Sequence, residues 1–134
     1  MGSAPTLTWL HDVGIGAAEQ GLEELSGLAL AHDRRSLWVV GDETARLFRV
    51  DLEGRLDPEA TVELLDEDIE GITLDPGGVF LYAVREKGNE ILQVDLGGRK
   101  VVARRRLKRM AGYEALAPLF AGSMAVSKGL EGIA

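Results

Sequence analysis

Three short joins along the chain place an oxygen-bearing side chain directly before a glycine. Ser26, Glu70 and Glu131 hold this position, and in each case a strand is predicted to begin there. Carboxylate oxygens that converge from several such joins suit a hard cation such as Ca²⁺, which takes about 6–8 oxygen ligands. The recurrence of one join within 134 residues indicates a structural repeat that gathers these side chains in one place.

The repeat is visible when the chain is compared with itself at an offset of 44 residues. Residues 27–54 then align with residues 71–98 without a gap, and apolar, polar and turn positions coincide. The same offset pairs Asp42 with Glu86, at the end of the second predicted strand of each repeat. Each repeat therefore contributes acidic positions in an equivalent place.

Each repeat has the pattern of four short strands, rich in β-branched and aromatic residues or alternating apolar with polar residues. The expected strands are 27–31, 36–42, 45–51 and 61–65 in the first repeat, and 71–75, 80–86, 90–96 and 100–107 in the second. Between the first two strands of the second repeat, Pro76 and Gly77 predict a type II turn. Repeats of about 40–50 residues with four strands are typical of propeller blades. We therefore predict an all-β fold, a partial β-propeller of four-stranded antiparallel blades.

A single domain is expected to span residues 1–134. Its predicted parts are blade 1 at about 22–66, blade 2 at about 67–109, an insertion at 110–129 and the start of blade 3 at 130–134. The insertion is expected to hold a short helix or a lid loop. A strand at 6–13 has no repeat of its own, and we expect it to complete the last blade of a closed ring.

Two blades are fewer than the roughly four that a closed propeller needs. A two-blade piece exposes an apolar flank, which is a liability for a monomer. Two explanations stay open at this point: the chain is a fragment of a longer protein, or copies self-associate to close the ring. A homo-oligomer is the expectation if the chain is complete.

The acidic positions predict a divalent-cation site at the mouth of the channel. In a propeller the first strand of each blade lines the central channel, so residues at one end of these strands converge. The predicted ligands are Asp42, Glu70, Glu86 and Glu131, with Glu24 and Glu43 as weaker candidates. The alternative is structural, because a carboxylate before a strand also accepts hydrogen bonds from nearby backbone N–H groups and ties blades together.

Composition excludes several other classes of function. The net charge of −7 and the pI of about 4.8 argue against nucleic-acid partners. The chain has no cysteine, which excludes disulfides and thiolate chemistry. No apolar run approaches the roughly 20 residues of a membrane span, and no signal peptide is visible at the start. The basic run at 103–109 is interpreted as a charged outer edge that blocks aggregation.

The histidines and the large aromatic residues have structural interpretations. His11 and His32 each precede an aspartate, but adjacent residues on a strand point to opposite faces, so neither pair forms a natural dyad. Both histidines are predicted to be solvated turn residues. Trp9, Trp38 and Tyr82 are predicted to pack in the core or between blades.

Three stretches carry a resemblance to known proteins: "ELSGLAL" with "LWVVGDETARLFRVDLEG", then "DIEGITLDPGGVFLYAVREKGNEILQVDL", and "KGLEGIA". Over about residues 22–134 the chain resembles the SdiA-regulated protein family and the related phytase-esterase-like propellers. Members of these families are longer, generally with enough repeats for a whole ring. The resemblance implies a β-propeller that is often exported or associated with the cell envelope and sometimes binds calcium.

Three functional hypotheses follow. The first is a binding module of the SdiA-regulated type, stabilised by Ca²⁺ at the channel mouth and recognising a small molecule or a protein. The second is a metal-assisted hydrolase of phosphate or carboxylic esters, in which a cation polarises the substrate and activates water. The third is a truncated or engineered propeller fragment without activity of its own. The sequence identifies no catalytic residue, so it leaves open whether the protein is an enzyme.

Overall fold

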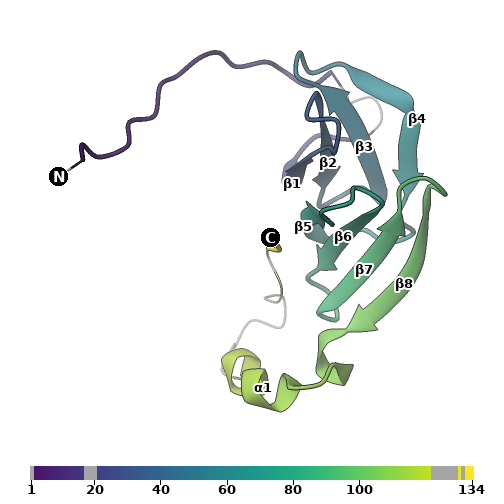
Figure 1. The fold of residues 1–134 in the computed structure, drawn as a ribbon. Coiled ribbons are helices and arrows are strands. Elements are labelled where there is room, and N and C mark those ends of the chain that lie inside the picture. The colour runs from purple at the N-terminus through teal and green to yellow at the C-terminus, as the bar shows by residue number, and fades with distance from the viewer. Residues whose placement is uncertain (1, 17–20, 122–129, 131) are drawn as a thin grey trace.

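Two four-stranded antiparallel sheets form the body of the protein. The structure is a computed structural model that describes residues 2–16, 21–121, 130 and 132–134. The first sheet, blade 1, contains β1 (Leu25–Leu30), β2 (Ser36–Gly41), β3 (Arg46–Asp51) and β4 (Leu56–Glu63). The second sheet, blade 2, contains β5 (Ile69–Leu74), β6 (Phe80–Arg85), β7 (Glu90–Asp95) and β8 (Lys100–Arg106). In both sheets the strands lie side by side in chain order (Figure 1), as in a propeller blade, so the predicted partial β-propeller is confirmed.

The two blades share one hydrophobic core. Val40 and Leu47 of blade 1 and Leu81 and Leu92 of blade 2 belong to this core and are buried completely. Their alternation along each strand sends every second side chain into the space between the sheets. A smaller apolar cluster around Phe48 covers the opposite face of blade 1. At the offset of 44 residues Leu92 of the shared core corresponds to Phe48 of the smaller cluster, so the two blades meet through opposite faces.

The inner strands of the blades approach each other at a glycine. A Cβ atom added to Gly27 would lie 3.0 Å from the Cα atom of Gly71 and 3.2 Å from the nitrogen of Ile72. A Cβ atom added to Gly71 would in turn lie 3.1 Å from the Cα atom of Gly132. Each glycine of the repeated joins thus permits the close passage of the next join along the chain.

The turn at Asp75–Gly78 differs from the predicted type II turn. The N–H of Gly78 donates to the carbonyl of Asp75 over 3.0 Å, which closes a four-residue turn. The left-handed φ of +70° belongs to Gly78, whereas Gly77 has no positive φ. A type II turn requires a positive φ at its third residue, here Gly77, so the predicted turn type is wrong. The Asp75 carboxylate accepts the N–H of Phe80 and holds the turn against the strand that follows.

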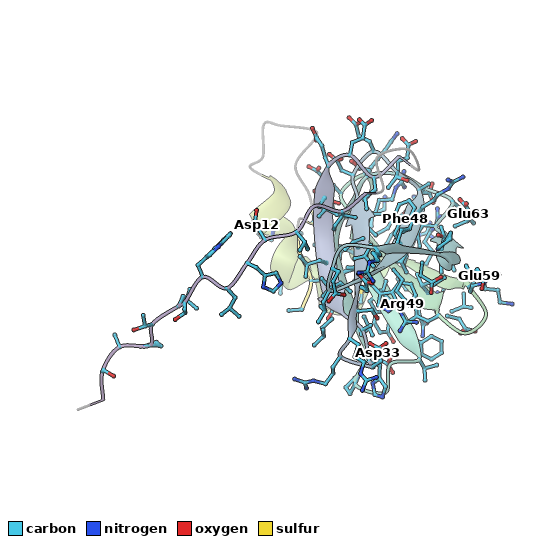
Figure 2. All side chains as sticks on the ribbon, turned by 90° about the horizontal axis from the view of Figure 1, so that it is seen from above. Asp12, Asp33, Phe48, Arg49, Glu59 and Glu63 are labelled. Carbon is cyan, nitrogen blue, oxygen red and sulfur yellow. The ribbon has the colours of Figure 1, made fainter. Side chains whose placement is uncertain are left out.

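The segment at 6–13 forms no strand, so that prediction is wrong. It belongs to an arm that projects away from both sheets, with Asp12 on it (Figures 1 and 2). Among the described strands none lies beside the arm, and its backbone therefore has no ladder to join. Trp9 is 77% exposed, which contradicts its predicted packing, whereas Trp38 is buried as expected. The fourth strand of blade 1 also begins earlier than predicted, at Leu56.

The insertion after blade 2 contains helical turns. A short 3₁₀ turn, η2, spans Leu107–Arg109, and the helix α1 spans Tyr113–Ala121. The predicted short helix is therefore present, while residues 122–129 of the predicted insertion lie outside the described residues. None of the described helices has the length and apolar character needed to cross a bilayer.

Candidate metal centre

A β-bulge lies at the repeated join in both blades. The pairing of β1 with β2 shifts register between Leu25 and Gly27, and the pairing of β5 with β6 shifts between Ile69 and Gly71. The extra residue of each bulge is therefore the one directly before the glycine. Bulges redirect a side chain out of the regular alternation of a strand. This explains why the joins place a polar residue at the beginning of an otherwise apolar inner strand.

Backbone hydrogen bonds position a second acid beside the bulge of blade 2. The N–H of Asp68 donates to the carbonyl of Asp42 in blade 1 over 2.7 Å. The carbonyl of Asp68 accepts the N–H of Glu86 at 3.2 Å, and its Oδ2 atom accepts the N–H of Lys87 at 2.7 Å. These bonds hold Asp68 at a φ of +74°, a left-handed conformation that aspartate tolerates better than most residues.

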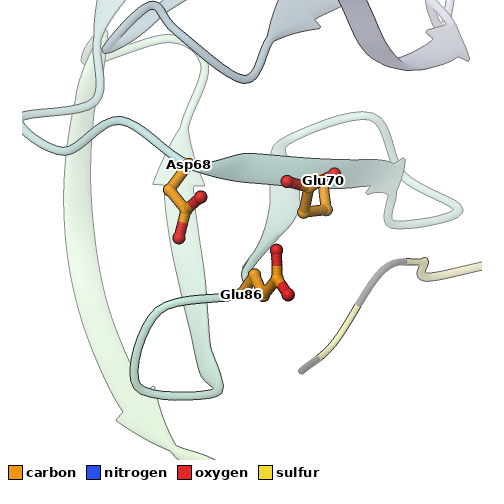
Figure 3. Close-up of side chains that lie close together, drawn as sticks. All are labelled: Asp68, Glu70 and Glu86. Carbon is orange, nitrogen blue, oxygen red and sulfur yellow. The ribbon is translucent and has the colours of Figure 1, made fainter. Parts of the chain in front are cut away.

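Asp68, Glu70 and Glu86 converge at this end of blade 2. Each offers one carboxylate oxygen, and the three oxygens lie within 4.8 Å of one another. Figure 3 shows the carboxylates of Glu70, on β5, and Glu86, directly after β6, pointing toward each other, with Asp68 beside them. All three side chains are half-buried. Like charges this close repel one another unless a cation or a proton lies among them, so the acid triad Asp68, Glu70 and Glu86 is suited to a cation.

The structure brings together two of the four predicted ligands. Glu70 and Glu86 belong to the acid triad, whereas Glu131 lies outside the described residues. Asp42 is not a member of the triad but contacts it through the backbone bond to Asp68. Within the part of the chain that the structure describes, the Oδ1 atom of Asp42 is buried and has no hydrogen-bond partner. The weaker candidates Glu24 and Glu43 are not in the triad either.

Asp68 was missed by the sequence analysis although the repeat contained its signal. The offset of 44 residues pairs Asp68 with Glu24, so both repeats have an acid two residues before the bulge. The alignment of the repeats began at Gly27 and Gly71, after these positions. Extending it by three residues would have added Asp68 to the candidates.

The equivalent position in blade 1 has a structural role. Ser26, the bulged residue there, donates its hydroxyl to the carbonyl of Ile69 in blade 2. The hydroxyl therefore ties the two blades together at the inner strands. The structural alternative applies at Ser26, while at Glu70 the same bulge presents an acid to its neighbours.

The basic run near the end of blade 2 surrounds a buried carboxylate. Glu90 is only 2% exposed and forms ion pairs with Arg85 and Arg106, both at 3.1 Å, and with Arg104 at 3.8 Å. Burial alone would raise the pKa of Glu90, but the hydrogen bonds from Arg106 and Arg85 and the charge of Arg104 outweigh it and lower the pKa. The run therefore neutralises a buried acid in addition to charging the outer edge strand β8.

The two histidine–aspartate pairs do not form dyads. His32 is exposed in the turn between β1 and β2, as predicted, and His11 is exposed on the arm. Asp33 instead accepts hydrogen bonds from the N–H of Arg35 and from the Ser36 hydroxyl. The bond from Arg35, with smaller contributions from Ser36 and Arg49, lowers the pKa of Asp33 despite partial desolvation.

Comparisons with known proteins agree with this architecture. Residues 20–134 match the family described as "Phytase-like: Esterase-like activity of phytase". This match supports the second of the two resemblances drawn from the sequence, and the SdiA-regulated resemblance stays a prediction. No curated protein sequence matches the chain.

Among solved structures, hydrazine synthase from Kuenenia stuttgartiensis is similar to the fold. The TM-score is 0.51 at 20% sequence identity, over 60% of this chain. The matched region is 23% of the hydrazine synthase chain, so this chain spans only a small part of that protein's length. At this identity the similarity supports the propeller-type fold and carries no statement about activity.

Proposed function

Because the chain belongs to the phytase-like family, we propose that it is part of a propeller binding module that holds a divalent cation, Ca²⁺, at the acid triad. The observation that carries this proposal is the convergence of carboxylate oxygens from Asp68, Glu70 and Glu86 within 4.8 Å. Carboxylates are ligands of choice for Ca²⁺, which tolerates irregular geometry and needs no nitrogen or sulfur ligand.

Two further features support a cation at this place. The buried Oδ1 atom of Asp42 has no hydrogen-bond partner among the described residues, and such an atom is costly to leave unsatisfied. Asp42 adjoins the triad through the bond from the N–H of Asp68 to its backbone carbonyl, and we propose that a water bound to the cation satisfies this atom. Three carboxylates also leave part of a coordination shell of about 6–8 oxygens open. Oxygens of an anionic ligand fit those positions, so the cation would let an acidic chain bind a phosphate or a carboxylate.

The proposal is tested by thermal unfolding with added Ca²⁺ and with a chelator. A cation that binds only the folded state stabilises it by about 2.7 kcal/mol at a concentration 100 times its Kd. We expect Ca²⁺ to raise the unfolding temperature of the unmodified protein and Glu70→Gln to remove most of this increase. Glu43→Gln, at an exposed acid outside the triad, is the control. An unchanged unfolding temperature with Ca²⁺, or an equal increase in both variants, would contradict the proposal.

Metal-assisted ester hydrolysis is the second candidate, because the description of the family names an esterase-like activity. A cation at the acid triad would polarise an ester oxygen and lower the pKa of a bound water. The test is turnover of p-nitrophenyl acetate and p-nitrophenyl phosphate with and without Ca²⁺. Turnover that requires both Ca²⁺ and Glu70 supports hydrolysis. Calcium binding without turnover of either ester would support the binding module and contradict hydrolysis.

We also propose that copies of the chain associate and bury the exposed apolar surface of their blades against one another. Leu25, Leu28 and Leu30 on the inner strand β1 are each about half exposed, although inner strands of a closed propeller are covered by neighbouring blades. Light scattering on a sizing column tests this proposal. A defined dimer or trimer supports it, and a monomer at all concentrations contradicts it.

A further inference from the structure

A cleft lies between the two blades at the end opposite to the acid triad. Its volume is about 440 Å³, within the range of small-molecule sites, which are roughly 300–1,000 Å³. Blade 1 contributes Ala31, Trp38 and Ala60, and blade 2 contributes Leu74 and Leu96. These side chains give the cleft an apolar lining, as small-molecule sites usually have.

Two cationic side chains lie in the same cleft. Arg49 enters from β3 of blade 1, and Arg99 enters from the turn between β7 and β8 of blade 2. The carboxylate in the lining is Asp33, so two guanidinium groups face one acid. The lining also contains His32. With histidine counted as neutral, as in the net charge of −7 for the whole chain, the formal charge of the lining is +1.

Arg49 is held in a fixed position by its neighbours. Its Nη2 atom donates to Asp33 over 2.6 Å, and Figure 2 shows these two residues close together. Its Nε atom donates to the Ser36 hydroxyl over 2.9 Å. The guanidinium group also lies over the ring of Trp38, 5.5 Å from the ring centroid, within the range of a cation–π contact. These two bonds use only part of the five donor hydrogens of a guanidinium group.

Arg99 is anchored on the other side of the cleft. Its Nη1 atom donates to the carbonyl of Glu59 in blade 1, so this side chain also bridges the two blades. Among the described residues it forms no ion pair with a carboxylate. A guanidinium group that is oriented but not neutralised is a suitable partner for a carboxylate or phosphate.

We infer that this cleft binds a small amphipathic anion, an apolar ring or chain that carries one phosphate or carboxylate group. The apolar part would lie against Trp38 and the leucines of blade 2, and the anionic group would lie between Arg49 and Arg99. This inference does not depend on the cation proposal, because the two sites lie at opposite ends of the blades and share no residue.

Trp38 provides a direct readout of occupancy. The chain has two tryptophans, so Trp9→Phe leaves Trp38 as the single fluorophore without touching the cleft. We expect phenyl phosphate to change the Trp38 emission in a saturable way. Benzyl alcohol, which has the ring without the anion, should bind at least about tenfold more weakly, since a charge-assisted hydrogen bond contributes about 1.5–3 kcal/mol. Inorganic phosphate, which has the anion without the ring, should also bind at least about tenfold more weakly, since burial of an aromatic ring contributes about 1.5–3 kcal/mol.

Two variants made in the Trp9→Phe protein test separately the positive charge of the cleft and its free volume. Arg99→Asn removes the cation with a residue that accepts the left-handed φ of +52° at this position, and it should weaken phenyl phosphate binding about tenfold. Arg105→Gln, on β8 and outside the cleft, is the charge-matched control and should not change binding. Ala60→Leu fills the cleft without changing charge and should also abolish binding, with circular dichroism showing whether this variant is folded.

Three results would overturn the inference. They are the absence of a saturable change up to the solubility of phenyl phosphate, equal binding of benzyl alcohol, and equal losses for Arg99→Asn and Arg105→Gln. The Arg99 and Arg105 pair decides the question even if Ala60→Leu does not fold. Phenylacetate in place of phenyl phosphate then distinguishes a carboxylate ligand from a phosphate ligand.

Discussion

Blade 1 and blade 2 have the same bulge at the start of the inner strand but use it for different purposes. The bulged residue of blade 1, Ser26, binds the carbonyl of Ile69 and ties the blades together. The bulged residue of blade 2, Glu70, lies within a group of acids. The backbone irregularity is therefore shared by the repeat, and the side chain that it redirects determines whether the join is structural or suited to a ligand.

A second pair of equivalent positions shows a similar contrast. At the offset of 44 residues, Arg46 at the start of β3 corresponds to Glu90 at the start of β7. Arg46 forms one exposed ion pair with Glu63, whereas Glu90 is buried among three arginines. Repeats of one fold can therefore place a surface pair and a buried network at the same position, with very different consequences for stability.

The largest expected effect concerns this pair. Glu90→Gln removes the charge shared by three arginines and should lower the free energy of unfolding by about 2–3 kcal/mol, less than for a fully buried pair because the arginines retain solvent contact. Arg46→Gln breaks an exposed pair and should cost less than about 0.5 kcal/mol. Chemical denaturation of both variants measures the difference. Similar losses would show that the burial of Glu90 contributes little.

The Glu90 network also predicts a dependence of stability on pH. The folded state lowers the pKa of Glu90, so its contribution is present above the unfolded pKa of about 4.3 and is lost as the pH falls through the folded pKa. The unfolding free energy of Glu90→Gln should therefore vary less with pH in the acidic range than that of the unmodified protein. Parallel curves for the two proteins would contradict the assigned pKa direction.

The second-largest loss of stability is expected at the glycines of the joins, Gly27 and Gly71. Gly27→Ala places a methyl group against the backbone of β5, at 3.0 Å from Gly71, and should cost about 2 kcal/mol because both sheets resist displacement. Gly71→Ala meets Gly132 at 3.1 Å, in the segment 132–134, which belongs to no strand and is not held by a ladder of hydrogen bonds. We expect less than half the loss there, measured by the same denaturation experiment. A larger loss for Gly71→Ala than for Gly27→Ala would show that the contact between Gly71 and Gly132 is the less tolerant of the two.

The smallest effect concerns the hydroxyl that joins the blades. Ser26→Ala removes the donor to the carbonyl of Ile69 and should cost about 1 kcal/mol, the usual contribution of one hydrogen bond. Thr8→Ala, on the exposed arm, is a matched loss of a hydroxyl and should change stability little. Equal results for the two variants would show that the Ser26 bond is not a significant tie.

The repeat, the four strands of each blade and the all-β fold were predictable because they depend on local patterns. Period-two alternation and turn residues recur at one offset, and each blade expresses them in the same way. The early start of β4 and the type of turn at Asp75–Gly78 were not predicted. These features depend on hydrogen bonds between strands, which a pattern of residue types leaves undetermined.

The candidate site was predictable only in part, for the same reason. Glu70 and Glu86 were found because both lie at repeated positions beside strands. Asp68 is positioned by bonds with Asp42 of blade 1 and with Glu86 and Lys87 of blade 2, contacts between segments that are distant in the sequence. The arm at 6–13 has the alternation of a strand, but a strand also needs a neighbour, and the described part of the chain provides none beside it.

Calorimetric titration with Ca²⁺ tests the central contrast most directly, because it counts the cations that each chain binds. We expect one Ca²⁺ per chain, since blade 2 presents Glu70 where blade 1 presents Ser26. Glu70→Gln should abolish the binding, and Glu24→Gln, at the blade 1 position equivalent to Asp68, should leave it unchanged. Absence of binding, two cations per chain, or binding that survives Glu70→Gln would show that Glu70 does not form a cation site specific to blade 2.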